Sequence, residues 1–171
     1  MDRDYFRDKV ALVSGASRGV GFALAKKLVE RGAKVVITAR GENRLLDSET
    51  RLKELGGSVV AVTGDVGKWE DAEKMVKAAI DNFGRLDIVV NNAGVSMRGK
   101  FVDLSPEVCR QVAETNLMGT IYLSRAAIPH IRHRAGFAHA PEGCLCRVWL
   151  GSGDGLPAGG PGAVAHPGEK G

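Results

Sequence analysis

Cysteine is scarce in this chain of 171 residues, and its pattern excludes two kinds of site. The three cysteines are an odd number that fits no disulfide framework, and Cys144 and Cys146 lack the two-residue gap of a zinc knuckle. No apolar run reaches the roughly 18 residues that a membrane span needs, and no apolar signal region follows the charged residues 1–4. The sequence therefore predicts no metal site, no membrane partner and a cytoplasmic location.

Basic blocks with interleaved aromatic residues are also missing, although the net charge is +4. Such blocks are the usual sign of nucleic-acid binding. The basic residues stand among acidic ones on predicted helix faces, as Lys26, Lys27 and Glu30 do, which indicates a solvated surface. With an apolar fraction of 44%, the length fits one globular domain that binds no nucleic acid.

The most informative stretch is an apolar run, residues 9–14, that meets a glycine-rich turn and then a helical segment. Gly15 lets the chain leave the strand sharply, and Gly19 lets the backbone approach a phosphate. Gly21 lets the helix pack close to the strand, and the helix N-terminus offers free N–H groups to a pyrophosphate. Three glycines alone could also form only a tight turn; the strand before and the helix after them favour a nucleotide-binding unit.

Strand-like and helix-like segments alternate along the chain up to about residue 131. The predicted strands are residues 9–14, 34–39, 58–63 and 86–90, and the predicted helices are residues 20–31, 45–55, 72–83 and 106–131. Val20, Leu24 and Leu28 form the expected apolar stripe of the first helix. This alternation predicts an α/β fold with a doubly wound, Rossmann-type parallel sheet.

Arg40 follows the second predicted strand directly, at the place where this fold meets the adenosine ribose. An acidic residue there would bind a free 2′-hydroxyl and repel a phosphate, and an arginine does the reverse. Arg18, inside the glycine loop, can reach the same place. The two guanidinium groups favour NADP(H) over NAD(H), the alternative being that both are ordinary exposed arginines.

Three motifs together give the chain a family resemblance. The spacing of the loop glycines, Asn91-Asn92-Ala93-Gly94 after the fourth strand and Asn116 in the last helix resemble the short-chain dehydrogenase/reductase family over about residues 7–134. The resemblance implies the strand order 3-2-1-4, with the cofactor at the carboxyl ends of the strands. It also implies hydride transfer between NADP(H) and a small carbonyl or alcohol substrate, and a homo-oligomer with contacts from the helix that contains Asn116.

The resemblance also implies roles for single residues. Asp65 would accept a hydrogen bond from the adenine amino group beside the backbone N–H of Val66, although Asp65 could instead only begin the next helix. Asn116 would hold a water of a proton relay, whereas an asparagine within a helix is otherwise a mild defect. The residues expected to bind the cofactor are Gly15, Ser17, Arg18, Gly19, Val20, Gly21, Arg40, Asp65, Val66, Asn92, Ala93 and Gly94.

The catalytic pair of the family is missing from its expected place. The family has a serine after its fifth strand and, further on, a tyrosine followed four positions later by a lysine. This chain has only Tyr5 and Tyr122, and its only lysine beyond Lys100 is Lys170. Tyr5 and Lys9 have the right spacing but precede the first strand. Turnover is therefore expected to be negligible.

Residues 135–171 are dense in glycine and proline and carry no helical stripe. We interpret them as an irregular, disordered tail behind a dinucleotide-binding domain of residues 1–134. The strand-like run 144–150, followed by Ser152, could imitate the missing fifth strand. We hypothesise that the tail arises from a shifted reading frame or aberrant splicing. The alternatives to an oxidoreductase are an inactive dinucleotide-binding module and a non-functional truncated product.

Overall fold

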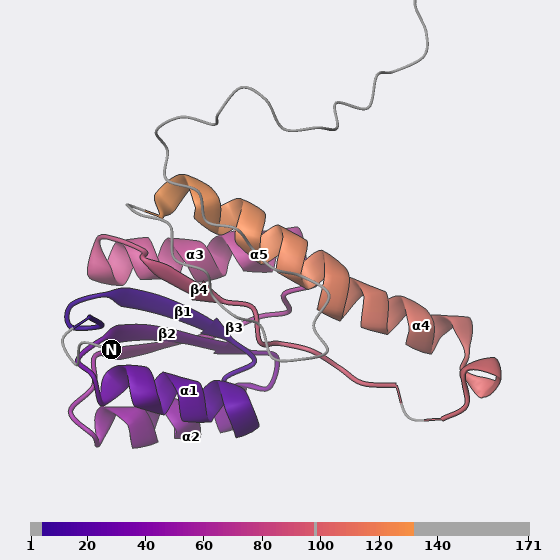
Figure 1. Ribbon diagram of the computed structural model, residues 1–171, viewed down its shortest axis with the longest axis horizontal. Helices are drawn as coiled ribbons and strands as arrows, with labels where there is room; N and C mark the ends of the chain where they lie inside the picture. The colour runs from indigo at the N-terminus through magenta and orange to yellow at the C-terminus, as the bar shows by residue number, and fades with distance from the viewer. Residues whose placement is uncertain (1–4, 98, 132–171) are drawn as a thin grey trace, which may run out of the picture.

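A computed structural model of the chain describes residues 5–97 and 99–131. Within them a parallel sheet is covered by helices on both faces (Figure 1). The strands are β1 (Val10–Ser14), β2 (Lys34–Ala39), β3 (Val59–Thr63) and β4 (Ile88–Val90). The helices are α1 (Gly19–Val29), α2 (Glu42–Lys53), α3 (Trp69–Phe83), α4 (Pro106–Val112) and α5 (Gly119–Ala127), with a π-helix η2 (Ala113–Met118) and 3₁₀ turns η1 (Phe101–Asp103) and η3 (Ile128–His130). The interpretations of residues 135–171, of the run 144–150 and of Ser152 lie outside the described residues.

The four strands of the described sheet are parallel and follow the order β3-β2-β1-β4. This confirms the predicted doubly wound, Rossmann-type topology. β1 pairs with β2 on one side and with β4 on the other, so that Ser14 lies beside Thr38 and Val13 beside Val90. The strand order reverses between β1 and β4, and ligands bind at such a reversal in open α/β sheets.

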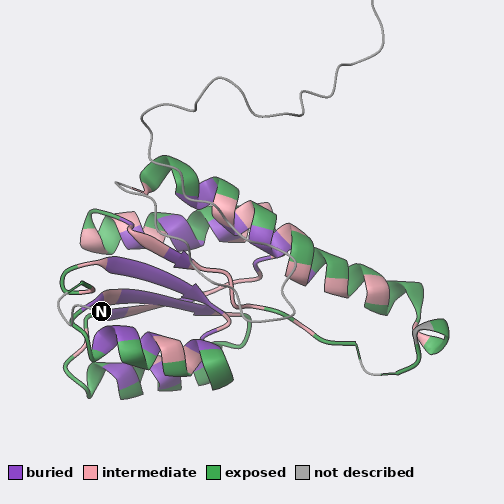
Figure 2. Ribbon diagram, viewed as in Figure 1, coloured by how far each residue is buried: buried purple, intermediate pink, exposed green. Residues whose placement is uncertain are grey.

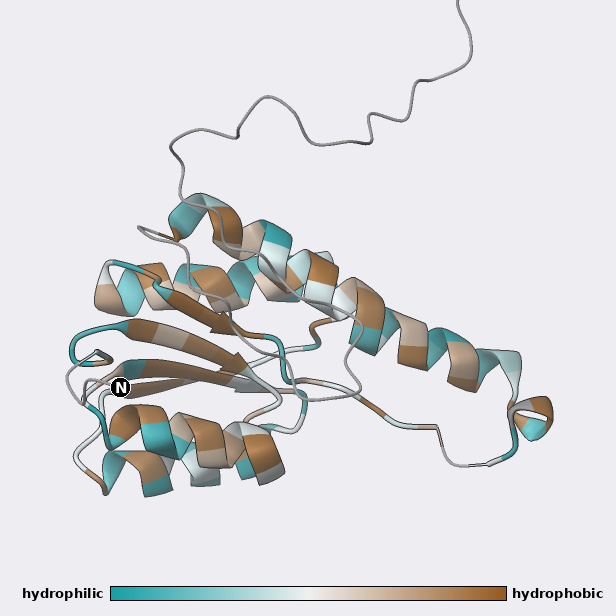
Figure 3. Cartoon of the chain, in the orientation of Figure 1, coloured by the Kyte–Doolittle hydropathy of each residue, from teal (hydrophilic) through white to brown (hydrophobic). Residues whose placement is uncertain are grey.

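Two apolar cores lie on the two faces of the sheet. Along β1, Val10 and Leu12 face the core under α3 and α5, while Ala11 and Val13 face the core under α1 and α2. All four side chains are fully buried, and the strands are the most buried and most hydrophobic part of the fold (Figures 2 and 3). A sheet covered on both faces requires such continuous apolar runs, which explains why the strands could be predicted from the sequence.

The stripe predicted for α1 is wrong at one position. Val20 is 68% exposed, and the buried residues of α1 are Gly21, Ala25, Leu28 and Val29. Successive residues of a helix point about 100° apart, so a helix that turns Gly21 toward β1 turns Val20 away from it. Val20 therefore lies at the carboxyl edge of the sheet and not in the core.

The long final helix is predicted as one segment, and the structure divides it. Ser105 caps α4 by accepting a hydrogen bond from the Val108 N–H at 3.4 Å. The π-helix η2 then interrupts the α-helical geometry around Asn116 before α5 continues. After η3, Ile131 forms an isolated parallel bridge with Leu86, just before β4. Within residues 5–97 and 99–131, no helix combines the length and apolar content of a membrane span.

Candidate dinucleotide-binding site

A cavity of about 860 Å³ opens at the carboxyl ends of the strands. Its volume lies in the range of small-molecule and cofactor sites. It is lined by residues 15, 17–21, 38–44, 64–66 and 92–95 and by Thr115. These segments lie at or directly after the carboxyl ends of the four strands, except for Thr115, which belongs to η2. All twelve residues expected to bind the cofactor line this one cavity.

The three loop glycines differ in how closely the neighbouring atoms approach them. Gly15 has a φ of +67°, and a Cβ there would lie 2.8 Å from Ala93 Cα. A Cβ on Gly21 would lie 2.6 Å from the Gly15 carbonyl oxygen and would overlap Asn92 Nδ2. Gly19 has a φ of +60°, and a Cβ there would meet nothing within 4 Å. Gly15 and Gly21 are therefore required by packing, whereas Gly19 borders open space.

The start of α1 fits a phosphate-bearing cofactor. Its N-cap residue is Arg18, whose guanidinium carries only donors, so no side chain of the N-cap residue occupies the first N–H groups of the helix. Such a terminus attracts anions through its N–H groups and its dipole. Across the cavity, the Thr38 hydroxyl oxygen is buried without a hydrogen-bond partner among the described residues. A buried polar atom in this state is expected where a ligand completes the site.

Asn92 and Ser14 fasten the ends of β1 and β4 together. Asn92 Nδ2 donates to the carbonyl oxygens of Ser14 at 2.8 Å and Gly15 at 3.2 Å. Ser14 Oγ in turn accepts from the N–H groups of Asn92 and Ala93, each at 3.0 Å, and donates to the Val90 carbonyl at 3.2 Å. These hydrogen bonds link the two neighbouring strands where both end at the cavity.

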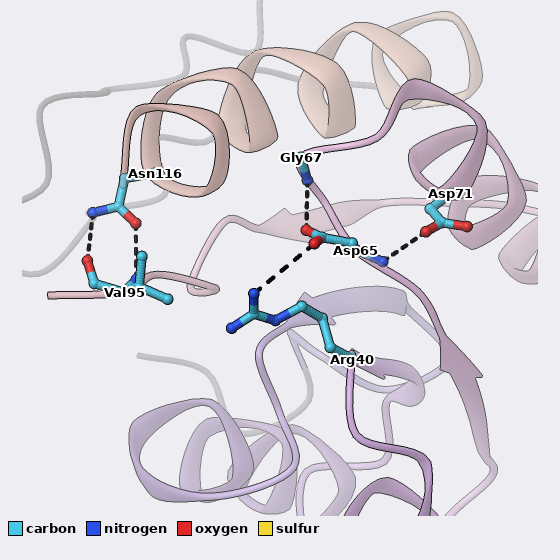
Figure 4. Close-up of polar contacts among 6 residues, drawn as sticks. All are labelled: Arg40, Asp65, Gly67, Asp71, Val95 and Asn116. Atoms are coloured by element: carbon cyan, nitrogen blue, oxygen red, sulfur yellow. Dashed lines mark hydrogen bonds and ion pairs between the residues drawn. The ribbon is translucent and has the colours of Figure 1, made fainter. Parts of the chain in front are cut away.

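Asn116 holds the loop that follows β4 (Figure 4). Its Oδ1 accepts from the Val95 N–H at 2.8 Å, and its Nδ2 donates to the Val95 carbonyl at 2.9 Å. The backbone carbonyl of Asn116 accepts from Thr120 Oγ1 at 2.9 Å. Asn116 itself does not line the cavity, whereas Thr115 and Val95 do. The structure gives the side chain a positioning role, and the relay role remains a prediction.

Three arginines and two carboxylates give the cavity its charge. Arg18, Arg40 and Arg44 line it together with Glu42 and Asp65. Sequence reasoning missed Arg44 because it began the second helix at Leu45, whereas α2 already begins at Glu42. Arg44 lies in the first turn of α2, close after Arg40, and no spacing rule in the sequence marks this early helix start.

Asp65 is held by several contacts in the loop after β3. Its Oδ1 accepts from the Gly67 N–H at 3.0 Å, and its own N–H donates to Asp71 Oδ2 at 2.8 Å (Figure 4). The N-cap position of α3 belongs to Lys68, so Asp65 does not simply begin that helix. Its Oδ2 lies 3.9 Å from Arg40 Nη1. The carboxylate is thus presented to the cavity.

Neither tyrosine of the chain belongs to this site. Tyr5 is 55% exposed before β1 and packs edge-to-face against Phe6. Tyr122 packs against Trp69 between α5 and α3, with ring centroids 5.9 Å apart. Nowhere in the described part of the chain do three His, Cys, Asp or Glu side chains gather closely enough to hold a metal ion.

Comparison with known proteins identifies the family. A family model described as short chain dehydrogenase matches residues 9–137. The chain belongs to the short-chain dehydrogenase family. An uncharacterized oxidoreductase of Bacillus subtilis is 41% identical over 128 residues, which are 75% of this chain and 36% of that protein. An 11-beta-hydroxysteroid dehydrogenase of Arabidopsis thaliana is 41% identical over 130 residues, 75% of this chain and 37% of that protein.

Solved structures of short-chain dehydrogenases share the fold. One from Burkholderia phymatum in complex with NAD superposes with a TM-score of 0.73 at 30% identity, covering 77% of this chain and 46% of that one. L-sorbose reductase from Gluconobacter frateurii, complexed with NADPH and L-sorbose, gives a TM-score of 0.69 at 33% identity, covering 72% and 47%. The chain thus spans about a third to a half of the length of these family members.

Proposed function

We propose that the chain is the dinucleotide-binding part of a short-chain oxidoreductase that prefers NADP(H) to NAD(H). The observation that carries this proposal is the shared cavity of the glycine loop and the arginines after β2. The loop and the N-terminus of α1 would hold the pyrophosphate, because both offer backbone N–H groups without obstructing side chains. Arg18 and Arg40, with Arg44 beside them, would bind the 2′-phosphate, since guanidinium groups form charge-assisted hydrogen bonds with phosphate oxygens.

The remaining lining residues fit the rest of the cofactor. Asp65 and Val66 would contact the adenine. The part of the cofactor between the pyrophosphate and the nicotinamide would lie along Asn92, Ala93 and Gly94. When bound, the nicotinamide supplies or accepts a hydride, which interconverts a carbonyl and an alcohol in this family. The role of this chain's residues is to bind and orient the cofactor at the carboxyl edge of the sheet.

We further propose that the chain itself has negligible turnover. General acid–base catalysis needs a proton-transferring group within hydrogen-bond reach of the substrate. Tyr5 and Tyr122 are the only tyrosines of the chain, and neither lines the cavity. An inactive dinucleotide-binding module and a non-functional truncated product are the alternatives. A cytoplasmic location and a homo-oligomer stay predictions from the sequence.

A fluorescence titration of the purified chain with NADPH and NADH tests the proposal, followed by a panel of simple ketones and aldehydes. We expect NADPH to bind more tightly without being oxidised. Arg40→Ala should weaken NADPH binding about tenfold, roughly 1.4 kcal/mol, and change NADH binding little. Arg110→Ala is the matched control, because Arg110 is an exposed arginine of α4 that does not line the cavity.

Each other outcome contradicts one part of the proposal. Equal affinity for NADH contradicts the NADP(H) preference. Oxidation of NADPH by any carbonyl compound of the panel contradicts the lack of turnover. Failure to bind either nucleotide contradicts the binding function and favours a non-functional product.

A further inference from the structure

Arg40 and Asp65 face each other between the end of β2 and the loop after β3 (Figure 4). Asp65 Oδ2 lies 3.9 Å from Arg40 Nη1, and the side chains are 30% and 51% exposed, respectively. Of the three arginines that line the cavity, Arg40 is the one with an ion-pair partner within residues 5–97 and 99–131. Arg18 and Arg44 have none in that part of the chain. The arginine placed nearest to the end of β2 is therefore partly neutralised.

The geometry indicates that Asp65 is the fixed partner of this pair. The Gly67 N–H donates to Asp65 Oδ1 at 3.0 Å and fixes the carboxylate. The Asp65 N–H donates to Asp71 Oδ2 at 2.8 Å and fixes the backbone. Arg40, in contrast, extends into the cavity on a long, half-exposed side chain. An ion pair of 3.9 Å between partly exposed groups is weak, so the guanidinium can leave it for a better anion.

We infer that Asp65 is a specificity-determining residue that competes with the cofactor's 2′-phosphate for Arg40. The inference rests on the proposed function, because it requires this phosphate to reach Arg40. A phosphate must break the Arg40–Asp65 pair to bind the guanidinium, whereas an unphosphorylated ribose leaves the pair intact. Asp65 therefore lowers the preference for NADP(H) below the value that three lining arginines would otherwise produce.

The test compares two fragments that differ only in the 2′-phosphate, adenosine 2′,5′-bisphosphate and AMP. Their dissociation constants for the full chain are measured by calorimetric titration. Asp65→Asn removes the charge and retains an oxygen that can accept the Gly67 N–H. We expect this variant to raise the preference for the bisphosphate about two- to fivefold, the size of an exposed charge interaction. A general effect of Asp65 on adenine binding affects both fragments and cancels in the ratio.

Two further variants connect the effect to Arg40. In an Arg40→Met background, Asp65→Asn should change the ratio of the two dissociation constants by less than about 1.5-fold. The guanidinium for which Asp65 and the phosphate compete is then absent. Asp81→Asn makes the same chemical change at an exposed carboxylate of α3 that pairs with Lys77, and it should leave the ratio unchanged. A chain that prefers the bisphosphate only after Asp65→Asn would support the inference and contradict the proposed preference of the natural chain.

Four outcomes would overturn the inference. A ratio that falls in Asp65→Asn means that Asp65 orients Arg40 toward the phosphate. An equal rise with and without Arg40 means that Asp65 acts on the phosphate directly. If the natural chain prefers the bisphosphate and Asp65→Asn leaves the ratio unchanged, the proposed function stands and the inference does not. If neither the natural chain nor the variant distinguishes the fragments, both are overturned.

Discussion

Asn116 binds both backbone polar groups of Val95, with Oδ1 at 2.8 Å from the N–H and Nδ2 at 2.9 Å from the carbonyl. This pair of hydrogen bonds joins η2 to the loop after β4, across 21 residues of sequence. Both residues are half-buried. The loop that lines one wall of the cavity is therefore held by a side chain that does not itself line it.

Loss of this two-point contact should release the loop. Asn116→Ala leaves two half-buried backbone groups of Val95 without their partner and should cost about 1–3 kcal/mol of unfolding free energy, measured by urea denaturation. The Val95 amide should also exchange its hydrogen faster. Asn82→Ala is the control, because Asn82 makes one exposed bond to the Ala78 carbonyl within α3. Equal losses in both variants would show that the Asn116 contact adds nothing to stability.

The π-helix that places Asn116 could not be predicted from the sequence. Local propensity extends one helix from residue 106 to residue 131, and Asn116 is only mildly unfavourable in it. The departure from α-helical geometry in η2 accompanies hydrogen bonds to Val95, a residue outside the helix. The strands, in contrast, were predicted within about two residues, because runs such as residues 34–39 have to be apolar when both faces of a sheet are covered.

Gly21 is the loop glycine with the tightest surroundings, and replacing it should be costly. In Gly21→Ala the new methyl group would lie 2.6 Å from the Gly15 carbonyl oxygen and would displace the Asn92 amide that joins β1 and β4. We expect a loss of about 1–3 kcal/mol in thermal or urea unfolding. Gly41→Ser is the control, since φ is −90° at that N-cap position and a Cβ there meets nothing within 4 Å. A Gly21→Ala chain as stable as the natural one would contradict the packing argument.

Sequence motifs predicted which residues line the cavity, but not which of their side chains interact with one another. The rule that ligands bind at the carboxyl ends of parallel strands placed Arg40 and Asp65 together, although 25 residues separate them in sequence. Their ion pair and the participation of Arg44 depend on side-chain directions and on the first turn of α2, which no spacing rule encodes. Val20 was assigned to both the core and the cofactor site, and the structure supports only the cavity position.

Glu49 covers the outer side of β3, which is an edge strand of the described sheet. Its carboxylate accepts the Ala61 N–H at 3.1 Å and pairs with Lys53 at 2.9 Å. Glu49→Ala should expose this N–H and cost about 1 kcal/mol of stability, with more light scattering on storage because open strand edges associate. Glu49→Gln retains an acceptor oxygen and should stay close to the natural chain. If both variants scatter equally, the charge and not the hydrogen bond protects the edge.

The hypothesis of a shifted reading frame makes a prediction about the coding DNA. The family match reaches residue 137, and the two relatives described above are similar over 128 and 130 residues. If the frame shifts near that point, another frame downstream of the His133 codon should encode an apolar strand ending in serine, then a tyrosine followed four positions later by a lysine. Sequencing this stretch of DNA provides the check, and the same search upstream of His133 is the control. The hypothesis of a shifted frame fails if neither alternative frame contains the strand and the pair.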